Sequence, residues 1–260
     1  MIKLPIFQVD AFTGNIFSGN PAAVIPLEYW LDEEKLQAIA AENNLSETAF
    51  FVNRGEYYHL RWFTPQTEVD LCGHATLASA YVIMNKIDTS LTEITFGTKS
   101  GELVVKRKGD TFSMDFPAHP PQKCDSPATL IKALDKEPKE VYTSNYYMAV
   151  YDNEDDILNL SPYMKLLKEL DRLAVIVTAP GKQVDFVSRF FAPAVGIPED
   201  PVTGSAHCTL IPYWADRLKK KKLIAHQISQ RGGEIFCEYR EKRVIIAGNA
   251  VMYLKGTIYI

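Results

Sequence analysis

Apolar and polar residues alternate along the first half of the chain with two spacings, one typical of strands and one of helices. Strand-like runs rich in Ile, Val, Phe and Tyr cover residues 2–12, 48–53, 57–63, 94–96, 102–107 and 111–116. Helical spacing of the apolar residues predicts one helix from Asp32 to about Asn44 and another from Gly73 to about Lys86. The first half is therefore predicted to mix strands with helices.

The second half repeats this mixture. Strands are predicted at residues 142–151, 173–178 and 185–191, and helices at residues 127–136, 161–170 and 204–222. Between the halves lie His119, Pro120 and Pro121, and a pair of prolines can continue neither a helix nor a central strand. We therefore predict two domains, residues 1–118 and 119–260, with a final strand at about 252–260 that can return to the first.

One short sequence motif, called the repeated phrase below, occurs in both halves. Residues 61–65 (Arg-Trp-Phe-Thr-Pro) precede a loop and a helix that opens at Gly73, and residues 189–193 (Arg-Phe-Phe-Ala-Pro) precede a loop and a helix that opens at Gly204. Both matches are separated by close to half of the 260 residues and keep their order. This spacing indicates an internal duplication and a pseudo-twofold fold.

The two predicted helix starts suggest a binding site for an anion. A helix N-terminus offers unpaired N–H groups and a partial positive charge, and glycine lets a ligand approach the backbone. Gly73 and Gly204 could serve turn geometry alone, but the repeated context favours a pair of helix ends that hold a small anionic metabolite. Ser205 could bond the carboxylate of that substrate or cap its own helix.

Glu47, His74 and Asp200 are the candidate proton-transfer residues. Glu47 lies where a helix ends and an apolar strand begins, so its carboxylate could be partly desolvated and suited to moving protons, or it could be a solvated turn residue. His74 follows the first glycine, where it can donate a hydrogen bond or relay a proton. Asp200 precedes the second helix start, where a carboxylate can polarise a substrate or cap the turn.

Other chemistries are less well supported by the spacing of the residues. Cys72, His74, His207 and Cys208 cluster around the helix starts but match no standard zinc spacing, so we predict no metal site. A nucleophilic pair of Cys72 and His74 is disfavoured because residues two apart on a strand or turn rarely face each other. The sequence contains neither a glycine-rich dinucleotide fingerprint nor a phosphate-binding loop with a lysine.

Composition narrows the class of protein further. A net charge of −4 gives no general attraction to nucleic acid or anionic membranes. The basic run at residues 217–222 is interpreted as the solvated end of a helix. No run reaches about 18 consecutive apolar residues, the start lacks the apolar core of a signal peptide, and the four cysteines form no CxxC pair. We expect a cytoplasmic protein that binds neither nucleic acid nor a membrane.

Several motifs in one order resemble the PhzF-like family of isomerases. They are residues 9–12 (Val-Asp-Ala-Phe), 19–24 (Gly-Asn-Pro-Ala-Ala-Val), 44–50 (Asn-Leu-Ser-Glu-Thr-Ala-Phe), 71–76 (Leu-Cys-Gly-His-Ala-Thr) and 199–207 (Glu-Asp-Pro-Val-Thr-Gly-Ser-Ala-His). The resemblance implies an α+β fold like that of diaminopimelate epimerase, in which each of two pseudo-symmetric halves wraps a mixed or antiparallel sheet around a central helix. It also implies a homodimer.

The resemblance implies an activity as well. Enzymes of this family that isomerise trans-2,3-dihydro-3-hydroxyanthranilate move a proton between ring carbons without a metal or organic cofactor. Their catalytic acid and base matches Glu47, and their substrate pocket matches Gly73, His74, Asp200, Gly204 and Ser205. Two alternatives remain open: an amino-acid epimerase or racemase that uses Glu47 with Cys72, and a metabolite-binding protein without catalysis. A racemase with two opposed thiols is disfavoured because Thr203 precedes Gly204.

Overall fold

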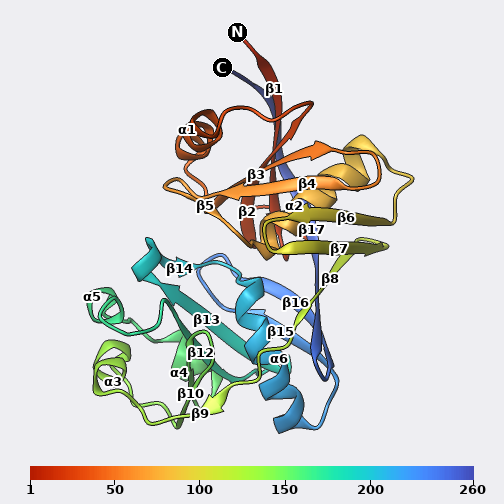
Figure 1. The fold of residues 1–260 in the computed structure, drawn as a ribbon. Helices are drawn as coiled ribbons and strands as arrows, with labels where there is room; N and C mark the ends of the chain where they lie inside the picture. Colours follow the sequence, from red (N-terminus) through yellow and green to blue (C-terminus); the bar gives the residue numbers. More distant parts are fainter. The chain divides into compact units, whose positions relative to one another are not determined.

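Apolar runs of the sequence become strands in the computed structural model, which describes residues 1–260 (Figure 1). The chain divides into two compact units: Met1–Asp115 with Ala247–Ile260 forms the first, and Phe116–Ile246 forms the second. Each unit combines strands with helices, so the predicted α+β class is confirmed. None of the helices has the length and apolar character needed to cross a membrane.

In the first unit, strands surround the buried helix α2 (Gly73–Val82). The other elements of this unit are β1 (Lys3–Ala11), β2 (Asn20–Leu27), α1 (Glu33–Asn43), β3 (Glu47–Asn53), β4 (Tyr58–Phe63), β5 (Glu68–Val69), a π-helical turn (Ile83–Ile87), β6 (Glu93–Thr98) and β7 (Gly101–Lys108). β8 (Thr111–Pro117) and β17 (Arg243–Tyr259) continue from one unit into the other. All of α2 except Gly73 and Tyr81 is buried, because its residues are mostly small or apolar and it packs against β1, β2 and β3.

The second unit is built around α6 (Gly204–Leu218), most of which is buried. Its other elements are β9 (Gln122–Lys123), α3 (Ala128–Leu134), β10 (Glu140–Thr143), β11 (Tyr147–Val150), α4 (Glu154–Leu158), α5 (Met164–Leu167), β12 (Val175–Pro180), β13 (Phe186–Ala192), a 3₁₀ turn (Pro193–Val195), β14 (Ile197–Asp200), β15 (Lys222–Gln227) and β16 (Gly233–Arg240). A cluster of buried apolar residues from α3, α4, α5 and the neighbouring strands forms a core beside this sheet.

The two units share one order of strand pairings. An antiparallel pair (β1–β2 or β10–β11) leads to a parallel pair (β2–β3 or β11–β12) and then to a second antiparallel pair (β3–β4 or β12–β13). A short strand then pairs back (β5 or β14), a second parallel pair follows (β4–β6 or β13–β15), and an antiparallel pair comes last (β6–β7 or β15–β16). The repeated phrase of the sequence lies at equivalent points, on β4 and β13.

Three predicted elements differ from the structure. The strand predicted at 142–151 is two strands, because Ser144–Tyr146 forms the turn between β10 and β11. The helix predicted at 161–170 is reduced to α5, and α4 was not predicted although Asn153 caps it by accepting the N–H of Asp156. The helix predicted to reach Lys222 ends at Leu218, because Lys219 takes the left-handed conformation (φ 55°) and the chain then enters β15.

Candidate active site

Glu47 begins strand β3 directly after helix α1 has ended. Asn44 closes α1 in the left-handed conformation (φ 49°), which turns the chain into the strand within three residues. β3 is buried from Glu47 to Val52, so the glutamate stands at the margin of the apolar core. Its side chain is 12% exposed to solvent, whereas the atom Oε2 is fully buried. A carboxylate in this position is shielded from water but not sealed from a ligand.

His74 lies in the first turn of α2. Cys72 precedes the helix in an extended conformation (φ −146°, ψ 109°), and no side chain caps the helix start with a hydrogen bond. Thr76 instead donates both its N–H (3.1 Å) and its hydroxyl (2.6 Å) to the carbonyl of Cys72. The helix therefore opens at Gly73 without a capping side chain, which suits the approach of an anion to its backbone.

The imidazole of His74 is the centre of a buried polar cluster. Its Nε2 lies 3.0 Å from Oε2 of Glu47, and the N–H is not aligned well enough for a good hydrogen bond, so the contact is best described as an ion pair. Its Nδ1 lies 3.2 Å from Nδ2 of Asn20 and 3.5 Å from Sγ of Cys72. When Nδ1 carries a proton, the Asn20 amide must turn its oxygen toward the ring. These contacts bring β2, β3 and the start of α2 together.

The charge of His74 is set by its burial and by the neighbouring Glu47 and Cys72. Burial disfavours the imidazolium, but the sulfur of Cys72 and the carboxylate of Glu47 stabilise it, and the pKa of His74 lies well above its ordinary value. Burial raises the pKa of Cys72 to about 11, and the charge of Glu47 adds to the rise. Because the thiol is protonated at neutral pH, the Glu47 carboxylate is the charge that holds the imidazolium there. The cluster is therefore a carboxylate–imidazolium pair beside a neutral thiol.

The sequence argument against contact between Cys72 and His74 is wrong. The extended Cys72 and the first-turn His74 bring sulfur and imidazole together, because the chain changes direction between them. The raised pKa nevertheless makes Cys72 a weak nucleophile. The ligand atoms of Glu47, Cys72 and His74 lie within 4.8 Å of one another and could hold a metal ion, a set that the spacing of residues in sequence did not reveal. The absence of a resident metal stays a prediction.

Asp200 ends β14 in the second unit, shortly before α6. The hydroxyl of Thr203 donates to Oδ2 of Asp200. Gln227, which is fully buried at the end of β15, donates to the carbonyl of Asp200 (2.7 Å) and accepts the N–H of Thr203 (2.9 Å). Gln227 therefore fixes the loop that carries Asp200. Sequence analysis missed it because a single glutamine at a strand end carries no motif.

Gly204 and Ser205 open α6 as predicted, again without a side-chain cap. Oγ of Ser205 lies 3.2 Å from the hydroxyl of Tyr146, in the turn between β10 and β11. In the next turn, Nδ1 of His207 donates to the carbonyl of Thr203 (2.8 Å). Burial lowers the pKa of His207 to about 4, so this ring is neutral at physiological pH. The predicted site residues thus gather as two clusters, one in each unit, each at the start of a buried helix.

Comparisons with known proteins agree with one another across the whole chain. The sequence profile of a family described as phenazine biosynthesis-like protein matches residues 9–256. An uncharacterized isomerase of Pseudomonas aeruginosa is 53% identical over 259 residues, which cover 100% of both chains. The crystal structure of a PhzF-family phenazine biosynthesis protein from Enterococcus faecalis superposes with a TM-score of 0.98 at 46% identity and covers 100% of both chains.

A more distant structure extends the likeness in fold alone. A hydroxyproline epimerase from Agrobacterium vitis matches with a TM-score of 0.63 at 8% identity, covering 98% of this chain and 92% of that one. The predicted epimerase-like fold is thereby confirmed.

Proposed function

Because the chain belongs to the phenazine biosynthesis-like (PhzC-PhzF) family and is an isomerase, we propose that it moves a proton between carbon atoms of a small carboxylic acid, with Glu47 as acid and base. The observation that carries the proposal is the buried contact of 3.0 Å between Oε2 of Glu47 and Nε2 of His74. This contact places an acid–base side chain directly beside a positive charge, a pairing that suits proton transfer at carbon.

The proposed reaction requires transfer of a proton, stabilisation of the negative charge that develops, and binding of the substrate carboxylate. Glu47 and His74 can perform the first two. Glu47 takes a proton from one carbon of the substrate and returns it to another, so no net proton is consumed. His74 stabilises the negative charge that develops when the carbon–hydrogen bond breaks. Burial of both side chains limits exchange of the transferred proton with water.

Binding of the substrate carboxylate is the third task. Within the first unit we assign it to the start of α2 at Gly73, since this helix opens without a capping side chain. Within the second unit, Gly204 and Ser205 at the start of α6 offer an equivalent position for an anion. Asp200 would polarise an amine or hydroxyl group of the substrate. This assignment rests on the family resemblance and on the local geometry of each helix start.

The decisive experiment follows the reaction in heavy water. We would incubate trans-2,3-dihydro-3-hydroxyanthranilate, the substrate that the resemblance suggests first, with wild-type protein and Glu47→Gln. Mass spectrometry would measure isomerisation, and deuterium gain would report the fraction of transferred protons that exchange with solvent. Loss of a general acid–base residue should slow turnover by about 10² to 10⁴-fold. Glu42→Gln, an exposed glutamate on α1, is the matched control and should match wild type.

Outcomes of this experiment separate the candidate functions. Turnover by Glu47→Gln at the wild-type rate would disprove the role of Glu47. If wild type turns over neither this compound nor any of a panel of small cyclic and amino acids, yet binds one of them tightly, the chain is a binding protein.

An epimerase that uses Cys72 with Glu47 is the second candidate. The contact of 3.5 Å between Sγ of Cys72 and Nδ1 of His74 favours it, whereas the thiol pKa of about 11 disfavours it. Racemisation of an amino or imino acid that disappears in Cys72→Ser and persists in Cys124→Ser would support this candidate over the first.

A further inference from the structure

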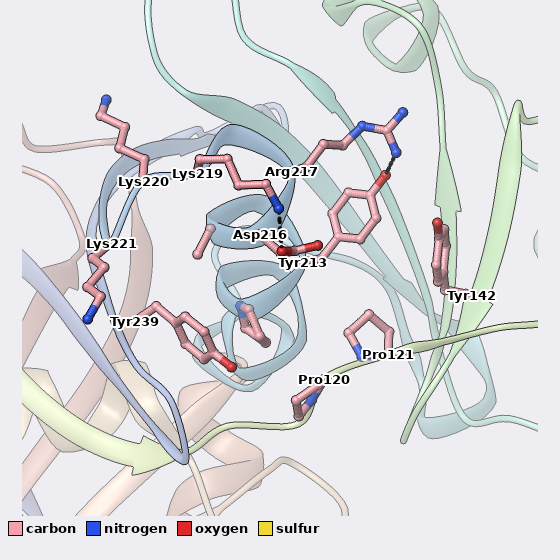
Figure 2. Close-up of a pocket in the computed structure, with 12 residues that line it drawn as sticks. Pro120, Pro121, Tyr142, Tyr213, Asp216, Arg217, Lys219, Lys220, Lys221 and Tyr239 are labelled. Carbon is pink, nitrogen blue, oxygen red and sulfur yellow. Dashed lines mark hydrogen bonds and ion pairs between the residues drawn. The ribbon is translucent and has the colours of Figure 1, made fainter.

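A pocket of about 720 Å³ lies at the opposite end of α6 from Gly204, within the second unit (Figure 2). Helix α6 has 15 residues, so its two ends are about 20 Å apart. The pocket is therefore separate from the cluster around Asp200 and Ser205. Its lining comes from the last turns of α6, the turn into β15, the proline pair before β9, and strands β10 and β16.

One part of the pocket wall is flat and apolar. The rings of Tyr142 and Tyr213 meet edge to face with centroids 5.1 Å apart, and Pro120 and Pro121 lie below them in Figure 2. Tyr213 is held in place because its hydroxyl accepts a hydrogen bond of 2.5 Å from Arg217, which also donates to Glu140. A wall of tyrosine and proline faces favours a planar ring, which can stack on it with little loss of conformational freedom.

The pocket lining is also strongly cationic. Arg217 lies beside Tyr213, and Lys219, Lys220 and Lys221 form the other edge, whereas Asp216 is the one acidic residue of the lining. Lys219 pairs with Asp216 (2.8 Å), and Lys220 pairs with Asp185 (2.5 Å). The ammonium group of Lys221 makes no ion pair within the chain. It is the cation of this edge that can bind a ligand without breaking an existing pair.

Further unused donors belong to the same pocket. The hydroxyls of Tyr142 and Tyr239 make no hydrogen bond within the chain, although both side chains are half-buried. Two carbonyls of the last turn of α6 are already satisfied, since the N–H of Lys220 bonds to Ala215 (3.1 Å) and that of Lys219 bonds to Asp216 (3.4 Å). The C-terminal end of α6 therefore has fewer unpaired carbonyl groups than an open helix end, and it repels an anion less.

We propose that this pocket binds a small molecule that combines a planar ring with a phosphate or carboxylate group. The ring would stack on Tyr142 and the proline faces, and the anionic group would bind Lys221 with the hydroxyl of Tyr239, which lies on the same side of the pocket in Figure 2. A volume of about 720 Å³ is in the range of pockets that hold molecules of nucleotide size. Such a site lies apart from Glu47 and His74 and does not depend on the isomerase reaction proposed for them.

Titration calorimetry of the full-length chain tests this proposal with four probes. AMP and salicylate carry both a ring and an anionic group, whereas adenosine lacks the anion and inorganic phosphate lacks the ring. We expect AMP, salicylate or both to bind at millimolar concentration or below, and adenosine and phosphate each to bind at least about tenfold more weakly. The tighter of AMP and salicylate identifies the preferred anion, and affinity should fall as salt concentration rises.

Variants locate the binding in this pocket. Lys221→Ala and Tyr142→Leu should each lower the affinity for the probe that binds by about tenfold or more. The first removes a charge-assisted contact and the second a stacking contact. Lys168→Ala, an exposed lysine of the same unit outside the pocket, is the matched control and should bind as wild type does. Unchanged unfolding midpoints establish that the variants are folded. The proposal is overturned if neither AMP nor salicylate binds, or if both pocket variants bind as tightly as Lys168→Ala.

Discussion

Arg61 and Arg189 each make the same two-pronged hydrogen bond to a glutamate within their own unit. Arg61 donates Nε and Nη2 to the two carboxylate oxygens of Glu68 (2.7 and 2.9 Å), and Arg189 does the same to Glu199 (2.7 and 3.0 Å). Each guanidinium also lies over the phenylalanine two residues later, 5.2 Å from the ring of Phe63 or 4.9 Å from that of Phe191. The duplicated phrase in the sequence is thus matched by duplicated side-chain geometry.

These pairs join the central strand of each unit to the loop that precedes its buried helix. Glu68 lies on β5, shortly before Cys72, and Glu199 lies on β14, next to Asp200. Both arginine side chains are only 12% exposed, so the pairs are shielded from solvent and salt. We infer that the pairs hold the loops that deliver the candidate catalytic residues.

Replacing either arginine by lysine should therefore destabilise the protein. Lysine keeps the charge but cannot form two parallel hydrogen bonds with one carboxylate or lie flat on a ring. We expect Arg61→Lys and Arg189→Lys each to lower the free energy of unfolding by about 1–3 kcal/mol in urea titrations. Lys106→Ala breaks an exposed pair with Glu93 and should change the free energy of unfolding by less than about 1 kcal/mol. Equal effects of all three changes would contradict the assigned role.

The fold could be predicted from the sequence to the extent that local patterns determine it. The helices at Gly73 and Gly204 and the strands around them follow from apolar runs with glycine at their ends. Residues 142–151 have the pattern of one strand because they are rich in tyrosine, and the turn at Ser144 carries no glycine or proline. The short helices depend on tertiary packing, since α4 lies against β12 and β13 and α5 lies against α3, and the single cap at Asn153 is too weak a signal to predict α4.

The candidate site could be predicted only where a motif marks it. Glu47 and His74 belong to motifs, and the structure brings them to 3.0 Å although 27 positions separate them. Asn20 lies in the motif at residues 19–24 but the sequence assigns it no role, and Gln227 lies in no motif, because both roles arise from contacts between segments far apart in the sequence. The rule that residues two apart do not face each other holds for regular strands, and it fails for Cys72 and His74 because an extended residue meets a helix there.

His207 should make the folded state less stable in mild acid. Its pKa of about 4 in the folded protein is below the ordinary value of 6.5, so the unfolded chain binds this proton more readily. Stability is fully present above about pH 6.5 and falls as the pH drops toward 4, by about 3 kcal/mol in total. Urea titrations from pH 7 to 4 should show this slope in wild type and in the control His226→Asn, at a partly exposed histidine of β15. His207→Asn keeps a donor for the carbonyl of Thr203 but removes the titrating ring, so its stability should change less between pH 7 and 4.

His74 acts on stability with the opposite sign. Its pKa in the folded protein is raised, so its contribution is fully present below pH 6.5 and is lost as the pH rises through the raised value. The same ionisation should control catalysis, because the imidazolium is the group proposed to stabilise the negative charge that develops on the substrate. We expect kcat/KM to be level through neutral pH and to fall on the alkaline side. His74→Gln should lower the plateau about 10²-fold and remove the alkaline fall; an unchanged alkaline limb would assign it to another group.

The four cysteines should differ in reactivity. Cys72, Cys208 and Cys237 are buried, and burial raises the pKa of Cys72 to about 11 and that of Cys208 to about 12. Cys124 is half-buried and is the most accessible thiol. A colorimetric disulfide reagent at pH 8 should label one thiol quickly in the folded protein and four in urea. The fast phase should disappear in Cys124→Ala and persist in Cys72→Ala; the reverse result would show that Cys72 is an activated thiol.

Gly19 occupies a position where the backbone tolerates no side chain. Its φ is +67°, and a Cβ atom there would lie 2.2 Å from the carbonyl oxygen of Ala11, across the hairpin of β1 and β2. Gly19→Ala should therefore destabilise the protein by about 2–4 kcal/mol in urea titrations. Gly55 is the matched control, since its φ is +85° but a Cβ would meet nothing within 4 Å, and Gly55→Ala should cost about 1 kcal/mol.

The position of Gly19 also connects this hairpin to the proposed chemistry. Asn20 follows it directly and contacts Nδ1 of His74, so a hairpin forced open at Gly19 should move that amide. Gly19→Ala should consequently lower kcat at temperatures where the variant remains folded, whereas Gly55→Ala should not. A variant that loses stability but keeps full kcat would show that Asn20 does not position His74, and the role of the pair Glu47–His74 would then rest on their own contact alone.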